Sequence, residues 1–263
     1  MIRALYTSST GLSAQQVVLD NTANNLANVN TNGFKRGQAD FQDLIYVNER
    51  NPGADAAQGL QVPTGLQIGS GVRVSGITKI FAQGSIVNTG NPLDVAIEGQ
   101  GFFQVTMPNG EIRYTRDGGL RMNAVGNIVT SDGFLLSPQV TIPTEAVSIS
   151  IGTDGTISVV NAGSNGASTT LGQLTLVRFP NPAGLSAEGR NLFAESASSG
   201  AATTSTPGLN GTGLIRQGFE ERSNVDTVTE LVNLILAQRA YEFNTRAITT
   251  ANNMLQATVD LIR

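Results

Sequence analysis

Histidine, cysteine and tryptophan are all absent from the 263 residues of this chain, and only 14% of its residues are charged. Without histidine, the chain lacks the commonest general base, the commonest zinc ligand and every Ser-His or Cys-His nucleophile pair. Without cysteine, it can form no disulfide and perform no thiolate chemistry. We therefore expect a protein that is not an enzyme, with no catalytic residue, no cofactor and no metal site.

Strong charge of one sign and long apolar runs are also missing. The chain has 16 basic and 20 acidic residues, and its longest basic run is Lys35-Arg36, so we expect no nucleic-acid partner. No stretch approaches the roughly 18 consecutive apolar residues of a membrane span, so we expect no membrane insertion. Polar residues soon follow Arg3, which leaves no continuous apolar segment typical of a signal peptide.

The N-terminal segment has the apolar spacing of a helix. Residues 1 to about 30 lack proline, and apolar residues recur at alternating steps of three and four. This seam comprises Ile2, Leu5, Leu12, Leu19, Ala23 and Leu26. Because Ser, Thr, Val and Asn are mediocre helix formers, the segment should be barely helical alone and should become ordered when it packs.

The C-terminal segment has a matching apolar seam. Ser223-Asn-Val-Asp226 predicts a helix N-cap, and no proline or glycine follows it. We also expect Glu242 and Arg246 to form an i,i+4 ion pair. The second seam comprises Leu231, Leu234, Ala237, Tyr241, Ile248, Ala251, Leu255 and Ile262. Two such seams predict helices that pack on each other and on neighbouring copies, as a self-assembling protein requires.

Asparagines accompany both seams. Asn24, Asn25 and Asn28 lie near the end of the first helix, and Asn244 lies within the second seam. Such amides can make polar contacts that set the register of a helical interface. Solvation of a loop is a comparable interpretation of those near the first helix.

The middle of the chain has the alternation of β-strands. In Leu93-Asp-Val-Ala-Ile-Glu98, apolar side chains alternate with others, and turn dipeptides such as Asn109-Gly110 recur downstream. The expected strands cover roughly 71 to 81, 93 to 106, 111 to 124, 128 to 136, 147 to 160 and 171 to 179. They predict a small antiparallel barrel or sandwich inserted between two helices that pair as a coiled-coil-like stalk. The expected fold class is therefore mixed α and β.

Composition and pattern also predict boundaries between parts of the chain. Tyr46 to Pro63 and Ala194 to Gly213 have the composition of linkers or extended arms. The expected division is a stalk helix at 1–34, an extended arm or linker at 35–70, a β domain at 71–193, a linker and return segment at 194–222, and a stalk helix at 223–263.

Two candidate chemical motifs have simpler structural interpretations. Asp94 and Glu98 lie about 13 Å apart by strand rise, too far for a glycosidase pair, so we expect a solvated strand face. Gly99-Gln-Gly101 lacks the third glycine and the helix of a dinucleotide loop, so we expect a strand-to-strand turn. Alternatives of other classes are a periplasmic protein that binds or hydrolyses cell-wall glycan with Asp94, Glu98 or Asp117, and a secreted coiled-coil adhesin.

Three long motifs resemble the bacterial flagellar rod and hook family. The segment from Ser8 to Arg36, SSTGLSAQQVVLDNTANNLANVNTNGFKR, resembles its N-terminal signature. The pieces ELVNLI, from Glu230, and QRAYEFN, from Gln238, resemble its C-terminal signature. The segment from Gly90 to Val105 is similar to its β domain. These motifs bracket the whole chain.

Within that family, the chain length and the segment from Tyr46 to Pro63 resemble the distal type of rod subunit, and the proximal type is the nearest alternative. The resemblance implies a structural subunit that polymerises helically into a straight, rigid driveshaft, which crosses the periplasm and transmits torque from motor to hook. It implies as partners other copies of the chain, proximal rod subunits, hook subunits, the surrounding L/P-ring bushing and the flagellar type III export apparatus. Export would not require a cleaved signal peptide.

Overall fold

The computed structural model describes residues 2–51, 55–57, 60–61, 64–162 and 167–260, and the chain forms two compact units. Unit 1 comprises Met1–Ala27, Gly37–Thr78 and Asp226–Arg263, and unit 2 comprises Asn28–Arg36 and Lys79–Val225. The chain thus passes from one unit to the other after residues 27, 36, 78 and 225.

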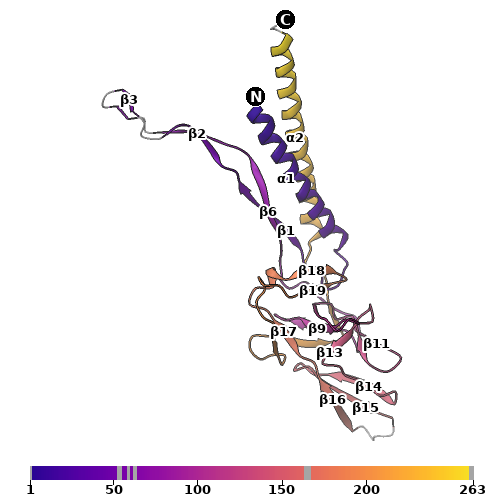
Figure 1. Ribbon diagram of the computed structural model, residues 1–263. Helices are drawn as coiled ribbons and strands as arrows, with labels where there is room; N and C mark the ends of the chain where they lie inside the picture. Colours follow the sequence, from indigo (N-terminus) through magenta and orange to yellow (C-terminus); the bar gives the residue numbers. More distant parts are fainter. Residues whose placement is uncertain (1, 52–54, 58–59, 62–63, 163–166, 261–263) are drawn as a thin grey trace. The chain divides into compact units, whose positions relative to one another are not determined.

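Two long helices form the helical part of unit 1. Helix α1 covers Ile2–Ala27 and helix α2 covers Thr227–Asp260, and they lie side by side in antiparallel directions (Figure 1). The mixed α and β fold class, with a long helix at each end of the chain around a large β domain, is confirmed.

The cap of α2 differs from the one expected. The helix begins after Asp226, whose carboxylate accepts hydrogen bonds from the Val228 amide at 3.2 Å and the Thr229 hydroxyl at 2.5 Å. Ser223, which we expected as the N-cap, instead accepts a hydrogen bond from the Val225 amide at 3.3 Å. That local turn holds residues 223 to 225 outside the helix, so the expected cap at Ser223 is wrong.

The remainder of unit 1 is a two-stranded ribbon that begins beside α1 and continues away from it (Figure 1). The described residues of the arm expected from Tyr46 to Pro63, which are 46–51, 55–57 and 60–61, belong to this part of unit 1. The other residues of that stretch lie outside the described part. Its paired strands are β1 (Gly37–Asp43) with β6 (Val72–Lys79), β2 (Tyr46–Arg50) with β5 (Leu66–Gly69), and β3 (Asp55–Ala57) with β4 (Leu60–Gln61).

Unit 2 is built around two antiparallel sheets. The larger is seven-stranded, in the order β11-β12-β13-β9-β10-β19-β18, and the smaller is three-stranded, in the order β14-β15-β16. The strands of the larger sheet are β9 (Phe103–Thr106), β10 (Ile112–Thr115), β11 (Arg121–Met122), β12 (Ile128–Val129), β13 (Leu135–Ser137), β18 (Ser186–Gly189) and β19 (Leu192–Ala194). Those of the smaller sheet are β14 (Ala146–Ile151), β15 (Thr156–Asn161) and β16 (Ser168–Gln173).

Three further strand pairs complete unit 2, and the first two of them join its end to its beginning. These pairs are β8 (Val95–Glu98) with β21 (Leu214–Gln217), β7 (Ile86–Asn88) with β22 (Phe219–Glu221), and β17 (Leu176–Arg178) with β20 (Thr203–Ser205). A short 3-10 helix covers Pro182–Gly184. The stretch from Ala194 to Gly213 therefore contributes a paired strand, and its Ser199 is fully buried.

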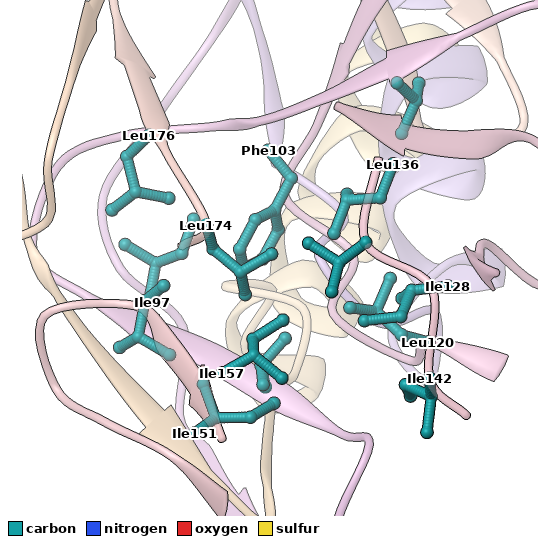
Figure 2. Packing of buried hydrophobic residues seen from close by; sticks show 14 of the residues in the cluster. Ile97, Phe103, Leu120, Ile128, Leu136, Ile142, Ile151, Ile157, Leu174 and Leu176 are labelled. Atoms are coloured by element: carbon teal, nitrogen blue, oxygen red, sulfur yellow. The ribbon is translucent and has the colours of Figure 1, made fainter. Parts of the chain in front are cut away.

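One apolar core fills the space between these strands (Figure 2). Phe103 and Leu136 come from the larger sheet, Ile157 from the smaller, and Ile97 from β8, and all are at most 2% exposed. A second cluster is aromatic and includes an edge-on contact between Tyr114 and Phe179, whose ring centroids lie 4.8 Å apart. Burial of this much apolar surface is what stabilises unit 2.

The strands expected at 93 to 106 and at 111 to 124 are each divided in two. Gly99 and Gly101, both with positive φ, connect β8 to β9, which confirms the expected strand-to-strand turn. Between β10 and β11, Gly118 packs so closely on the Val95 carbonyl that an added Cβ would lie 1.6 Å from its oxygen.

The expectation of a solvated face on β8 is wrong. Val95, Ala96 and Ile97 are all buried, so both faces of this strand are covered. Asp94 is 3% exposed because it accepts hydrogen bonds from Thr89 and Asn91 and forms an ion pair with Arg121 at 3.1 Å. Only Glu98, at the end of the strand, is exposed.

Candidate assembly surface and chain junction

The two terminal helices approach each other closely through small and polar side chains. Gly11 of α1 lies against Asn244 of α2, and an added Cβ at Gly11 would lie 3.1 Å from the Asn244 amide nitrogen. The buried residues of the helices are likewise mostly small or polar, and include Ala14 and Thr22 on α1 and Ala237 on α2.

Most of the expected α2 seam lies on the face that turns toward α1. Five seam residues share a face with Asn244 and are buried or half-buried, namely Leu234, Ala237, Ile248, Ala251 and Leu255. Leu231 and Tyr241 lie at its margins and are 45% and 40% exposed. Ile262 lies outside the described residues. Within one chain, this seam therefore serves the pairing of α2 with α1.

The seam of α1 is less completely covered. Leu5, Leu12, Leu19 and Leu26 are all half-buried, and Ala23 is exposed. Ile2, at the start of the helix, is 78% exposed. Apolar surface on these leucines thus remains available after the two helices pair.

Asn25 joins α1 to the ribbon. Its side chain is fully buried and makes two hydrogen bonds with the backbone of Gly37, donating to the carbonyl oxygen at 2.9 Å and accepting from the amide at 2.9 Å. Asn21 donates to the same carbonyl oxygen at 2.8 Å. Asn25 therefore fixes the register of β1 against the helix, a role that its position in the sequence alone did not specify.

The other asparagines have different surroundings. Asn24 is exposed on α1, and Asn28 belongs to unit 2, where its side chain accepts a hydrogen bond from the Thr31 hydroxyl at 3.1 Å. Asn244 is half-buried opposite Gly11. That these amides set a register between copies of the chain stays a prediction.

An outer face of α2 is also apolar, and its residues lie outside the seam predicted from the sequence. Phe243 is 66% exposed and Leu236 is 61% exposed. The set of large, exposed apolar residues on this face, here called the outer stripe, comprises Val228, Val232, Ile235, Leu236, Phe243 and Met254. They recur at helical spacing outside the face that carries Ala237, so α2 has apolar residues on more than one face and a single seam describes only part of them. Next to Phe243, Glu242 pairs with Arg239 at 2.9 Å, not with Arg246 as expected.

A buried ion cluster lies in unit 2, where the chain enters and leaves it. Glu221 is 1% exposed, and its carboxylate accepts hydrogen bonds from Lys35 Nζ at 2.6 Å and Arg116 Nε at 2.6 Å. Burial alone would raise the pKa of Glu221, but Arg116 and Lys35 outweigh it and hold that pKa below its ordinary value. Burial also lowers the pKa of Lys35, and Glu221 opposes that shift.

Arg116 extends this cluster to the turn between β8 and β9. Its guanidinium donates to the carbonyl oxygens of Ile97, Gly99 and Gly101, so the turn folds around a buried positive charge. Gly99 and Gly101 both have positive φ, a conformation that favours glycine. This contact explains the glycine pair without any nucleotide.

Backbone contacts complete the junction, which consists of residues 28–36, 79–85 and 219–225. Asn224 accepts a hydrogen bond from the Arg36 amide at 2.7 Å and donates to the Ile80 carbonyl at 2.8 Å. The Gly33 amide donates to the Glu221 carbonyl at 2.8 Å. Segments almost 190 residues apart in the sequence are thus hydrogen-bonded to one another.

The pKa of Glu220, next to Glu221, is shifted in the opposite direction. Burial and the neighbouring carboxylates of Asp94 and Asp117 raise its pKa above the ordinary value, and Arg121 opposes the shift. Its carboxylate accepts a hydrogen bond from Asn32 at 2.6 Å. A raised pKa in the folded state means that ionisation of Glu220 opposes folding.

Neither a membrane span nor a metal cluster is found in the described part of the chain. Over the residues described, neither helix is apolar enough to cross a membrane. Within the same residues, no three or more acidic side chains are grouped so that they could hold a metal ion.

The chain is similar over nearly its whole length to known flagellar proteins. The flagellar basal-body rod protein FlgG of Caulobacter vibrioides is 46% identical to it over 261 residues, which cover 99% of each chain. The chain belongs to the flagellar basal-body rod family. Other rod-family relatives are FlgG of Buchnera aphidicola subsp. Schizaphis graminum, 46% identical over 97% of this chain and 98% of the relative, and FlgG of Bacillus subtilis, 39% identical over 100% of both.

Three family profiles match separate parts of this rod-family chain. The flagella basal body rod protein profile matches residues 5–35, the flagellar hook protein FlgE/F/G D1 domain matches 96–159, and the flagellar basal body rod FlgEFG protein C-terminal profile matches 216–261. The first match includes Lys35 and the last includes Glu221. As a member of the rod family, the chain is a structural component of the flagellar basal body and not an enzyme, so hydrolysis of cell-wall glycan is excluded.

Replacing Asn25 tests its contact with the ribbon. In Asn25→Ala, Asn21 still donates to the Gly37 carbonyl, but the buried Gly37 amide loses its acceptor. We expect unit 1 to lose about 1–3 kcal/mol of unfolding free energy and the Gly37 amide to exchange hydrogen faster. Urea unfolding and hydrogen exchange measure both effects. The control is Asn253→Ala, an exposed asparagine in α2, and an equal loss in both variants would contradict the assignment.

Replacing Glu220 tests the electrostatics beside the junction. Because its folded-state pKa is raised, its contribution to stability is present below the ordinary pKa and is lost as the pH rises through the folded value. We expect Glu220→Gln to be more stable than the parent at pH 8 and to show a smaller loss of stability than the parent between pH 4 and pH 8. Urea midpoints at both pH values measure this, with the exposed Glu145→Gln as control. An unchanged slope in Glu220→Gln would refute the assignment.

Proposed function

We propose that this rod-family subunit polymerises helically into the straight, rigid distal rod, which transmits torque from the motor to the hook. The observation that carries this proposal is the apolar surface that remains exposed after α1 and α2 pair. Large exposed apolar patches mark interaction surfaces, because exposing apolar side chains to water is energetically unfavourable. In a homopolymer, that surface would be covered by neighbouring copies.

The two seams and the asparagines are the proposed assembly residues. The half-buried leucines of α1 and the α2 residues Leu231 and Tyr241 would contact other copies, while the inner part of the α2 seam holds the helix pair together. Asn24, Asn28 and Asn244 would contribute polar contacts that set the register. Stiffness would come from many such contacts acting together along the rod.

The partners and location follow from this proposal. The subunit would join proximal rod subunits at one end and hook subunits at the other, within the L/P-ring bushing, where the rod crosses the periplasm. It would reach that place through the flagellar type III export apparatus. Support comes from the similarity to proteins named FlgG over nearly the full length of both chains.

A charge in the inner part of the α2 seam tests whether polymerisation requires the helix pair that presents the exposed apolar surface. Leu255 is half-buried, and a buried, unpaired carboxylate is costly. We expect Leu255→Asp to form no straight tubes in electron micrographs of concentrated protein and to be absent from purified basal bodies, while unit 2 remains folded by circular dichroism. The matched control is Gln256→Asp, an exposed neighbour, which should polymerise normally.

Labelling of the parent chain in purified basal bodies separates the distal from the proximal assignment. A labelled parent chain should appear in the distal part of the rod in purified basal bodies. Label confined to the proximal part would favour the proximal type of subunit. Normal tubes and normal rods from Leu255→Asp would contradict the seam assignment.

A further inference from the structure

Unit 1 contains a second apolar surface, which forms a pocket. A pocket of about 260 Å³ opens between the first turns of α1 and the ribbon strands β2 and β5. Its apolar lining includes Ile2, Tyr6, Val47 and Ile68, which are between 38% and 78% exposed. The pocket therefore has apolar walls that no part of the described chain covers.

The outer stripe of α2 has one side chain suited to such a pocket. Phe243 is the only aromatic residue of the stripe and is 66% exposed, so it does not occupy the pocket of its own chain. Interfaces concentrate their binding energy in a few large side chains, often aromatic, that fill pockets on the partner. Pocket and side chain both belong to unit 1.

Charges beside the two surfaces are complementary. Arg3 lies in the pocket lining and pairs with Glu49 at 2.5 Å, and Arg239 pairs with Glu242 at 2.9 Å beside Phe243. All four side chains are at least 42% exposed. When two copies meet, Arg239 can pair with Glu49 and Glu242 with Arg3, so that no charge is left unpaired at the contact.

We propose that Phe243 of one copy inserts into the pocket formed by Ile2, Tyr6, Val47 and Ile68 of the next copy. This rests on the proposed function and names the contact through which the subunits would join. The contact is heterologous, because a knob on one surface enters a pocket on a different surface. Such contacts generate open filaments when the rotation between copies does not close into a ring.

Cysteine cross-linking tests this contact directly, because the chain has no cysteine of its own. Thr7 lines the pocket, and Ala247 is exposed one turn beyond Phe243. We would mix full-length Thr7→Cys and Ala247→Cys chains, let them polymerise and oxidise them. We expect a disulfide dimer that is abundant in the mixture. Ala257→Cys, about 15 Å farther along α2, is the control and should give none with Thr7→Cys.

The outcomes separate this contact from the proposed function. If straight tubes form and the Thr7–Ala247 product is absent, the contact is overturned while the polymer stands. If Ala247→Cys chains link mainly to each other, the stripes pair around a two-fold axis and the proposed contact is wrong. If the unmodified chain forms no tubes, the proposed function fails and the contact fails with it.

A second measurement remains decisive if the cysteine variants polymerise poorly. We expect Phe243→Ala and Tyr6→Ala each to raise the critical concentration for polymerisation about tenfold. The double variant should also raise the critical concentration about tenfold, because both changes remove the same contact. Val147→Ala, an exposed position in unit 2, should leave it unchanged. A hundredfold rise in the double variant, or no rise in either single variant, would overturn the proposal.

Discussion

The buried carboxylate of Glu221 is the interaction on which the junction of unit 2 depends. A carboxylate removed from water is stable only when cations and hydrogen-bond donors replace the water, and Lys35, Arg116 and the Gly84 amide do so here. The dependence is mutual, because each buried cation also requires the carboxylate. These groups come from segments far apart in the sequence, so the cluster forms only when all of them are in place.

This arrangement explains how a β domain can be inserted between two terminal helices. The segment that follows α1 in the sequence and the segment that precedes α2 both belong to unit 2, where Asn224 bridges Arg36 and Ile80. The chain can therefore leave unit 2 at several points without opening its core. The helices keep apolar surface exposed, which is the surface that the proposed assembly would use.

Periodicity was sufficient to predict both helices and the β character of the middle, because long helices and alternating strands leave strong patterns. It failed where two faces of one element are buried or apolar. Alternation predicts that Asp94 faces solvent because it assumes that one face of each strand is exposed, whereas both faces of β8 are covered. Phe243 lies outside the predicted seam because α2 has apolar residues on more than one face. The cap at Asp226 was missed because Ser223 forms a competing local turn.

The junction could not be predicted from one sequence. Lys35 appeared only as half of a basic pair, and Glu221 as one acidic residue among several. Their contact depends on the pairing of β22 with β7, which places Glu221 opposite Ile86. The partner of the Asn25 amide is the backbone of Gly37, and the sequence does not show which backbone groups a side chain will contact.

The most direct test compares two adjacent glutamates. Glu221→Gln leaves two buried cations without a carboxylate and should lower the unfolding free energy of unit 2 by about 3–5 kcal/mol at neutral pH. Glu220→Gln changes the neighbouring residue in the same way and should cause no loss. Urea unfolding of both variants beside the parent decides the matter. A Glu221→Gln chain as stable as the parent would contradict the central place given to the buried carboxylate.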